Sequence, residues 1–118
     1  MREIKFRAWD KVEKRFWYFT LQEILERRMS YRGSWDEKVL IGEKTQYTGL
    51  KDKNGKEIYE GDIVKIGDYP AYEVTINEFT QMHVIDNETG MEELWKNHKV
   101  CKIIGNIYEN PELLGDSQ

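Results

Sequence analysis

The stretch KDKNGKEIYEGDIV, residues 51–64, decides the fold because it turns the chain twice within a short distance. Asn54-Gly55 lies between Lys53 and Lys56 and predicts a hairpin, since both central residues tolerate a positive φ. Glu60-Gly61-Asp62 then turns the chain into a short apolar run at 63–66. A β-carbon penalises the backbone conformations that such turns need. We therefore expect an architectural role for three glycines of this region, Gly49, Gly55 and Gly61.

Strands follow one another at short intervals on the C-terminal side of this stretch. Runs that are apolar, or in which apolar and polar residues alternate, occur at 63–66, 72–76, 82–85, 92–95 and 100–107. A spacing of roughly 8–12 residues with turn signals between the runs is typical of a small barrel or sandwich. The tail has asparagine at 110, proline at 111 and glycine at 115, which predicts one helical turn.

On the N-terminal side, residues 4–9 and 15–19 predict a hairpin with its turn at 10–14. In the first strand, Ile4, Phe6 and Ala8 alternate with Lys5 and Arg7. This alternation predicts one buried face and one solvent-exposed face. By the same alternation Trp9 falls on the face of Lys5 and Arg7, which favours an exposed Trp9, while the sequence leaves open whether Trp9 and Trp17 are core or surface residues. Thr20 and Glu23 have the spacing of a capping box and predict a short helix after the hairpin. Residues 30–44 read as a connection that contributes at most one strand, at 39–41.

Composition limits the class of protein and its compartment. Hydrophobic residues make up 39% of the 118 residues and charged residues 34%, which excludes a membrane protein. The net charge is −4, with nine basic and five acidic residues in 1–32 (net +4) against nine and seventeen in 33–118 (net −8). The lone Cys101 allows no intrachain disulfide, and no apolar leader or span is visible. We therefore expect a cytoplasmic protein.

The sequence contains no pattern that predicts catalysis or metal binding. His98 and Cys101 have a metal-compatible spacing, but His83 is the only other histidine and zinc needs three or four ligands. We expect no metal, no cofactor and no small-molecule substrate, and we expect Cys101 to be a core residue. Hydrolase, nucleotide and metalloprotease motifs are absent, so we expect no enzyme. Carboxylates lie near predicted turns and are expected to be solvated at Glu57, Glu60, Asp62, Asp68, Asp86, Glu92 and Glu93.

Three blocks of sequence, at residues 4–10, 46–64 and 104–114, together resemble the YopX family of bacteriophages and prophages of low-GC Gram-positive bacteria. The resemblance implies a phage protein that acts in the host bacterial cell. It also implies that the C-terminal portion is similar to an SH3-type barrel, and it carries over no catalytic residues.

These observations predict a single α+β domain over residues 1–118 that is predominantly β. We expect an N-terminal β-hairpin and short helix in residues 1–44, joined to an SH3-like small β-barrel in residues 45–118.

The leading functional hypothesis is a non-enzymatic phage accessory protein that acts as a protein-interaction or self-assembling module, including as a homo-oligomer. Aromatic and arginine side chains dominate protein-contact hot spots, and the candidate binding residues are Arg7, Trp9, Arg15 and Trp17. The alternative is a nucleic-acid-binding module that uses the same basic, aromatic N-terminal face, because cations and stacking surfaces alternate there. No membrane partner is expected.

Overall fold

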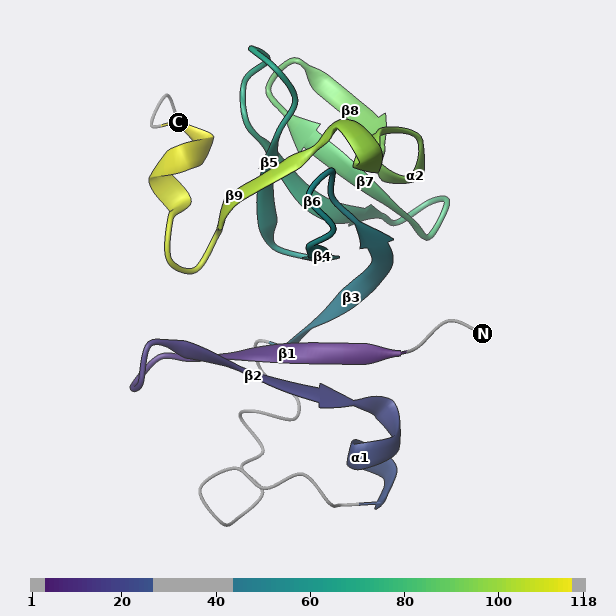
Figure 1. Cartoon of the computed structure of the whole chain (residues 1–118), viewed down its shortest axis with the longest axis vertical. Helices are drawn as coiled ribbons and strands as arrows, with labels where there is room; N and C mark the ends of the chain where they lie inside the picture. Colours follow the sequence, from purple (N-terminus) through teal and green to yellow (C-terminus); the bar gives the residue numbers. More distant parts are fainter. Residues whose placement is uncertain (1–3, 27–43, 116–118) are drawn as a thin grey trace. The chain divides into compact units, whose positions relative to one another are not determined.

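The computed structural model describes residues 4–26 and 44–115, and the strand considered at 39–41 lies outside these ranges. The chain divides into two compact units, residues 1–49 and 50–118 (Figure 1). This division lies five residues beyond the one expected from the sequence, inside a strand. As predicted, the chain is predominantly β, and its strands form two antiparallel sheets.

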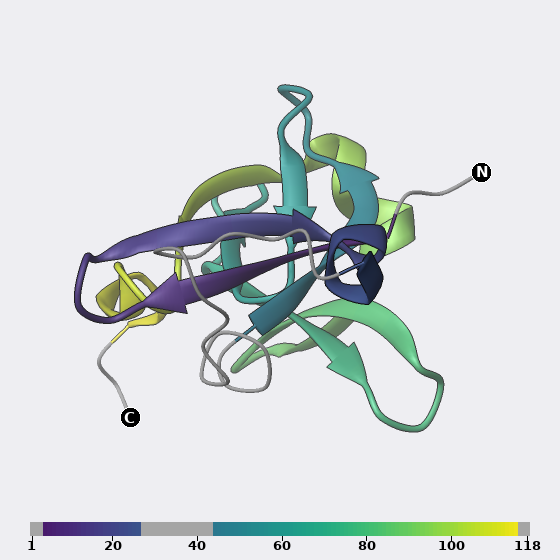
Figure 2. The ribbon, with the colours of Figure 1, turned by 90° about the horizontal axis from the view of Figure 1, so that it is seen from below.

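The first unit is built on the predicted hairpin, formed by β1 (Lys5–Asp10) and β2 (Arg15–Thr20) and visible in Figure 2. The helix α1 (Leu21–Glu26) follows directly. Its capping box is confirmed: the Thr20 N–H donates to Glu23 Oε1 at 2.8 Å, and the Glu23 N–H donates to Thr20 Oγ1 at 3.1 Å. On the other side of β1 lies β3 (Lys44–Lys51), which pairs with it antiparallel.

The first sheet has the strand order β2–β1–β3–β4, with β4 at Glu57–Tyr59. The hairpin predicted at Asn54-Gly55 exists, but its loop has three residues rather than two. The Asp52 N–H donates to the Lys56 carbonyl at 2.8 Å, and Gly55 alone in the loop has a positive φ, at 83°. In this geometry a turn is followed by one residue in the left-handed conformation, which is Gly55. Asn54 therefore has no positive φ, although an asparagine could adopt one.

Substituting Gly55 by valine is expected to lower the free energy of unfolding by about 1 kcal/mol or more. Nothing lies within 4 Å of a β-carbon built at Gly55, so the cost comes from the backbone conformation and not from a clash. Urea unfolding of the variant measures it, with Lys53→Val in the same loop as the control that should change little. An unchanged midpoint for Gly55→Val would show that this glycine does not set the turn.

The second unit contains a five-stranded sheet in the order β8–β7–β6–β5–β9. Its strands are β5 (Asp62–Lys65), β6 (Tyr72–Asn77), β7 (Met82–Asn87), β8 (Gly90–Glu93) and β9 (Lys102–Asn106). Gly61, at φ 90°, leads into β5, and a β-carbon there would lie 3.3 Å from the Tyr108 ring. Gly49 also has a positive φ, 88°. The three glycines therefore hold the conformations predicted for them.

The predicted strand at 92–95 ends at Glu93, and this part of the prediction is wrong. Residues Leu94–Asn97 form the helical turn α2, and His98–Val100 form the 3₁₀ turn η2. Leu94 is completely buried, and the Asn97 side chain donates to the Glu93 carbonyl at 2.7 Å. Burial of Leu94 in the core and closure of this turn override the local β pattern.

The core of the second unit is a cluster of completely or nearly completely buried side chains, namely Ile58, Val64, Tyr72, Val74, Ile85, Leu94 and Cys101. The prediction that Cys101 is a core residue is thus confirmed. The tail forms the predicted helical turn, η3 (Pro111–Leu114), with Gly115 after it at φ 88°.

Candidate interaction surface

The four candidate binding residues are divided between the two faces of the β1–β2 hairpin. Trp9 lies opposite Phe16 in the register, and Ala8 lies opposite Trp17. Because successive side chains of a strand point to opposite faces, Arg7 and Trp9 share one face and Arg15 and Trp17 the other. The hairpin therefore does not bring the four together on one surface.

The face that carries Arg7 is not the solvent-exposed face expected from the sequence. Arg7 is only 5% exposed, and its guanidinium carbon lies 4.1 Å from the centre of the Phe16 ring. Trp9 is half-buried and meets the same ring edge-on, with ring centres 4.9 Å apart. Trp9 is therefore less exposed than strand alternation favoured. The guanidinium is weakly hydrated and stacks on aromatic rings, so an arginine tolerates such a place better than a lysine would.

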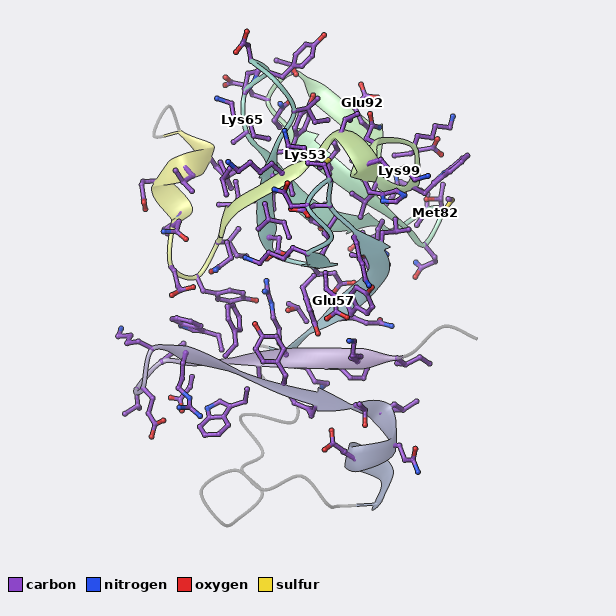
Figure 3. The ribbon with its side chains drawn as sticks, in the orientation of Figure 1. Lys53, Glu57, Lys65, Met82, Glu92 and Lys99 are labelled. Atoms are coloured by element: carbon purple, nitrogen blue, oxygen red, sulfur yellow. The ribbon has the colours of Figure 1, made fainter. Side chains whose placement is uncertain are left out.

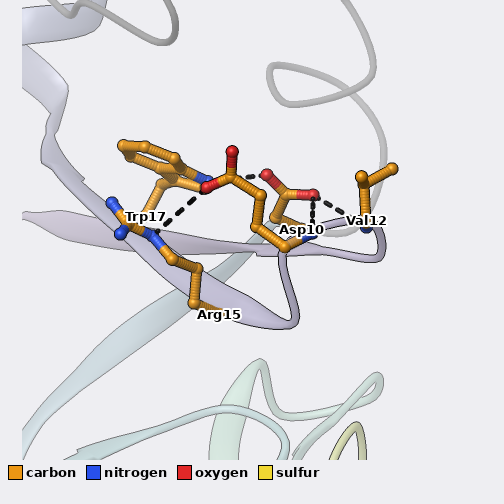
Figure 4. A network of polar contacts seen from close by, with 5 residues as sticks. Asp10, Val12, Arg15 and Trp17 are labelled. Atoms are coloured by element: carbon orange, nitrogen blue, oxygen red, sulfur yellow. Dashed lines mark hydrogen bonds and ion pairs between the residues drawn. The ribbon is translucent and has the colours of Figure 1, made fainter.

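On the opposite face, an apolar cluster of Phe6, Ala8, Trp17 and Phe19 ends in a polar network (Figure 4). The Trp17 Nε1–H donates to Asp10 Oδ2 at 3.0 Å, and the Arg15 guanidinium carbon lies 4.0 Å from the centre of the Trp17 rings. Both the N–H and one ring face of Trp17 are thus engaged within the hairpin. Within this network Arg15 is accessible to solvent, with 56% of its side chain exposed.

A different surface, missed by the sequence analysis, lies on the meander of β6, β7 and β8. Four large apolar side chains are exposed there, Ile76 at 37% and three that are more exposed: Phe79 at 99%, Met91 at 49% and Met82 at 40%. We call Phe79, Met82 and Met91 the meander surface. Its acidic surroundings were visible in the sequence, because residues 72–93 contain no lysine or arginine and six acidic residues: Glu73, Glu78, Asp86, Glu88, Glu92 and Glu93.

Asn77 contacts two of the three residues of the meander surface. Its Oδ1 accepts the Phe79 N–H at 2.8 Å, and its Nδ2 donates to Met91 Sδ at 3.4 Å. Asn77 also lies directly opposite Met82 in the register of β6 and β7. Asn77, at the end of β6, therefore contacts the Met91 side chain and the Phe79 backbone and lies beside Met82. An exposed apolar group of this kind is a mark of interaction sites.

Two carboxylates face each other within the meander. Glu73 of β6 lies directly opposite Asp86 of β7. Burial raises the pKa of Glu73 above its usual value, and the charge of Asp86 raises it further. At neutral pH a charged Glu73 therefore lowers the free energy of unfolding.

Substituting Glu73 by glutamine is expected to raise the free energy of unfolding at pH 7 by a few tenths to about 1 kcal/mol, because like charges directly opposite in a sheet are destabilising. Since the pKa of Glu73 is higher in the folded state, the gain should be absent below the usual value of 4.5, grow as the pH rises from 4.5 through the higher folded value, and be complete above it. Unfolding measured from pH 3 to pH 8 tests this, with the exposed Glu88→Gln as the control. A gain that did not depend on pH would contradict the charge explanation.

The titratable residues considered for chemistry have structural partners. His83 Nε2 lies 2.8 Å from Glu60 Oε2, and His98 Nδ1 lies 2.7 Å from the Lys51 carbonyl oxygen. Burial, and then the Asp52 carboxylate, raises the pKa of the Cys101 thiol to about 11, so the thiolate needed of a nucleophile is scarce. Among the described residues, no three histidine, cysteine or carboxylate side chains gather as a metal site would require.

One of the carboxylates expected to be solvated is buried. Asp62 is 3% exposed, and its Oδ2 accepts the Tyr59 N–H at 2.8 Å. The carboxylate closes the turn around Gly61 because a backbone N–H that is removed from water needs an acceptor. Asp62 is therefore part of the turn and not a solvated strand end.

Comparisons with known proteins give a family and a fold. None of the helices in residues 4–26 and 44–115 has the length and apolar character to cross a membrane. No curated protein matches the chain. The crystal structure of protein EF1440 from Enterococcus faecalis is similar, with a TM-score of 0.55 at 24% identity over 97% of this chain and 99% of that one. The YopX protein family matches residues 5–115, nearly the whole chain, and the chain therefore belongs to the YopX family.

Proposed function

We propose that this chain is a non-enzymatic phage accessory protein that works through protein–protein contact in the cytoplasm of a bacterial host. The observation that carries the proposal is the meander surface, where Phe79, Met82 and Met91 are exposed around Asn77. Aromatic side chains and methionine are enriched in protein interfaces relative to the rest of a protein surface. An almost fully exposed phenylalanine at a hairpin tip is available to insert into a partner.

The proposal includes an SH3-like small barrel for the second unit. Strands β5 to β8 form a meander, and β9 returns to pair with β5 after the short turns α2 and η2. This strand order and the helical turn before the last strand are what support the SH3-like description. Small barrels of this kind serve many unrelated functions, so the functional argument rests on the surface and not on the fold.

Nucleic-acid binding is the second candidate, and one observation favours it. Arg15 is half exposed above Trp17, beside the exposed Lys11 and Lys14 of the β1–β2 turn. Against it, Arg7 is buried against Phe16, and Trp17 already holds a cation on its ring, so fewer cations and ring faces remain for phosphates and bases. The protein-contact proposal therefore takes precedence.

Affinity capture from cells in which the phage is induced tests the proposal. The tagged chain is compared with Phe79→Ser, and with Tyr69→Ser as a matched control, since Tyr69 is also exposed but lies outside the meander surface. We expect a captured protein that survives nuclease treatment, is lost with Phe79→Ser and is kept with Tyr69→Ser. Capture that nuclease abolishes, or that Phe79→Ser leaves unchanged, would contradict the proposal.

The second candidate has its own measurement. If the hairpin binds DNA or RNA, the logarithm of the affinity should fall by roughly one unit per neutralised phosphate for each tenfold rise in salt. Titration of labelled oligonucleotides is expected to show weak binding that vanishes near about 0.15 M salt. Tight binding at that salt concentration that is lost in Arg15→Ala would replace the protein-contact proposal by the nucleic-acid one.

A further inference from the structure

Two exposed lysines face each other on the sheet of the second unit. Lys65 of β5 and Lys102 of β9 are directly opposite in the register, and their side chains therefore point to the same face of the sheet. Like charges directly opposite each other in a sheet are destabilising. Within the part of the chain that the structure describes, neither lysine is in an ion pair. This pair of charges therefore does not stabilise the fold.

Two further exposed lysines lie beside the start of β9. The Lys53 N–H donates to the Cys101 carbonyl at 2.9 Å, so Lys53 is next to the residue that precedes Lys102. Lys99 lies in η2, two residues before Cys101. We call Lys53, Lys65, Lys99 and Lys102 the lysine cluster, and Figure 3 labels three of them on the second unit.

The surroundings of the lysine cluster contain little negative charge that an anion would have to displace. Residues 51–56 and 94–103 contain six lysines and a single acidic residue, Asp52. Asp52 is 6% exposed, and its carboxylate accepts three backbone N–H groups. In these two segments no exposed carboxylate therefore competes for the lysines. The cluster is a local basic surface on a chain whose net charge is −4.

The chemistry and shape of the cluster favour a phosphate chain over a protein as its ligand. Lysine is depleted in protein interfaces relative to the rest of the surface, whereas it is a common ligand of phosphate, which it binds as a point charge. The cluster is also not flat, because Lys65 and Lys102 point from a face of the sheet while Lys53 and Lys99 lie around the start of β9. A flexible strand of phosphates can follow such a path.

We propose that the lysine cluster binds the phosphate backbone of single-stranded nucleic acid, independently of base sequence. A phosphate held between Lys65 and Lys102 removes their mutual repulsion, and the same strand reaches Lys53 and Lys99 through their long, flexible side chains. The inference goes beyond the proposed function, since it uses no residue of the meander surface. It also differs from the second candidate, which places nucleic acid on the β1–β2 hairpin.

Titration of a labelled single-stranded DNA oligonucleotide into the full chain tests the site, with fluorescence anisotropy measured from low salt to about 0.15 M. Each phosphate neutralised on a single strand adds roughly 0.7 to the slope of log affinity against log salt, so four lysines predict a slope of about −3. Two double variants, Lys65→Gln with Lys102→Gln and Lys53→Gln with Lys99→Gln, should each reduce this slope by about half. Each should also weaken binding at low salt at least about tenfold.

The matched control is Lys14→Gln, which removes an exposed lysine from the β1–β2 turn and should leave the affinity unchanged. Urea unfolding separates binding from folding, because the variant without Lys65 and Lys102 has lost a like-charge pair and should unfold at the same or a higher urea concentration. The proposal is overturned if the wild type does not bind at low salt, if either double variant binds as the wild type does, or if Lys14→Gln abolishes binding. A glutamate peptide of equal charge that binds the cluster as tightly as the oligonucleotide would replace nucleic acid by an acidic protein segment.

Discussion

Replacing Asp52 by alanine is expected to lower the free energy of unfolding by about 3 kcal/mol, the largest loss among the substitutions considered. Asp52 is 6% exposed and accepts three backbone N–H groups. Its Oδ1 binds the Asn54 and Lys56 N–H groups at 2.9 Å each, and its Oδ2 binds the Ile103 N–H at 3.0 Å. Alanine would leave three donors without this acceptor. Water can reach the exposed Asn54 and Lys56, but the half-buried Ile103 N–H would lose its partner, and an unsatisfied buried donor costs roughly 1–3 kcal/mol.

The effect of Asp52 should depend on pH in a defined direction. Burial alone would raise the pKa of this carboxyl, but the hydrogen bonds from Ile103, Lys56 and Asn54, with the charge of Lys56, hold it below its usual value of 3.8. Because the pKa is lower in the folded state, the ionised carboxylate stabilises the protein above pH 3.8, and this contribution is lost as the pH falls through the folded value. The difference between wild type and Asp52→Ala should therefore shrink in acid.

Chemical unfolding at pH 7 and at pH 3 measures both effects. The control is Asp68→Ala, which removes an exposed carboxylate from the turn before β6 and should change the free energy of unfolding by less than about 0.5 kcal/mol. Asp52→Asn should fall between alanine and the wild type, because its amide offers one acceptor oxygen and a competing donor. If Asp52→Ala were as mild as Asp68→Ala, the carboxylate would not be the connection between the turn and β9.

Replacing Asp10 by alanine is expected to cost about 2 kcal/mol, the second largest loss. Asp10 is 5% exposed; its Oδ1 accepts the Val12 and Glu13 N–H groups at 2.9 and 3.0 Å, and its Oδ2 accepts the Trp17 indole N–H. The cost is smaller than at Asp52 because Asp10 joins groups within a single hairpin, whereas Asp52 also holds the half-buried Ile103 N–H of β9, fifty-one residues away in the sequence.

Unfolding followed by tryptophan fluorescence, together with hydrogen exchange of the Val12 and Glu13 amides, measures the loss. Val12→Ala in the same turn is the control, because this side chain is 80% exposed and its backbone N–H is kept. Faster exchange at Val12 and Glu13 in Asp10→Ala alone is the expected pattern. Unchanged exchange and an unchanged midpoint would mean that Asp10 does not hold the turn.

Features that depend on neighbours in sequence were predictable. The capping box of Thr20 and Glu23, the β1–β2 hairpin and the turns at Gly55 and Gly61 all appear where the sequence places them. Each of these depends on hydrogen bonds or backbone conformations within a few residues, so the local pattern contains the information. The three-residue loop around Gly55 departs from the prediction only in detail, since Asn54 tolerates either conformation.

The candidate site was less predictable because exposure is not a local property. Strand alternation places Arg7 and Trp9 on one face, and this is correct, but it does not reveal that Phe16 covers them. Leu94 follows a β-like pattern and becomes helical because its burial in the core outweighs local preference. The meander surface depends on how Asn77 draws Met91 across the sheet, over fourteen residues of sequence.

By itself the sequence determined the family, the β-rich class, the positions of the turns and the burial of Cys101 as a core residue. Only the tertiary structure decided which cations are buried, that Asp52 connects its turn to Ile103 fifty-one residues away, and that Phe79, Met82 and Met91 are exposed on the β6–β8 meander. The physical reason is the range of the interactions. Turns and helix caps depend on hydrogen bonds and backbone conformations of residues that are close in sequence. Burial and the pairing of buried charges depend on which distant segments pack together.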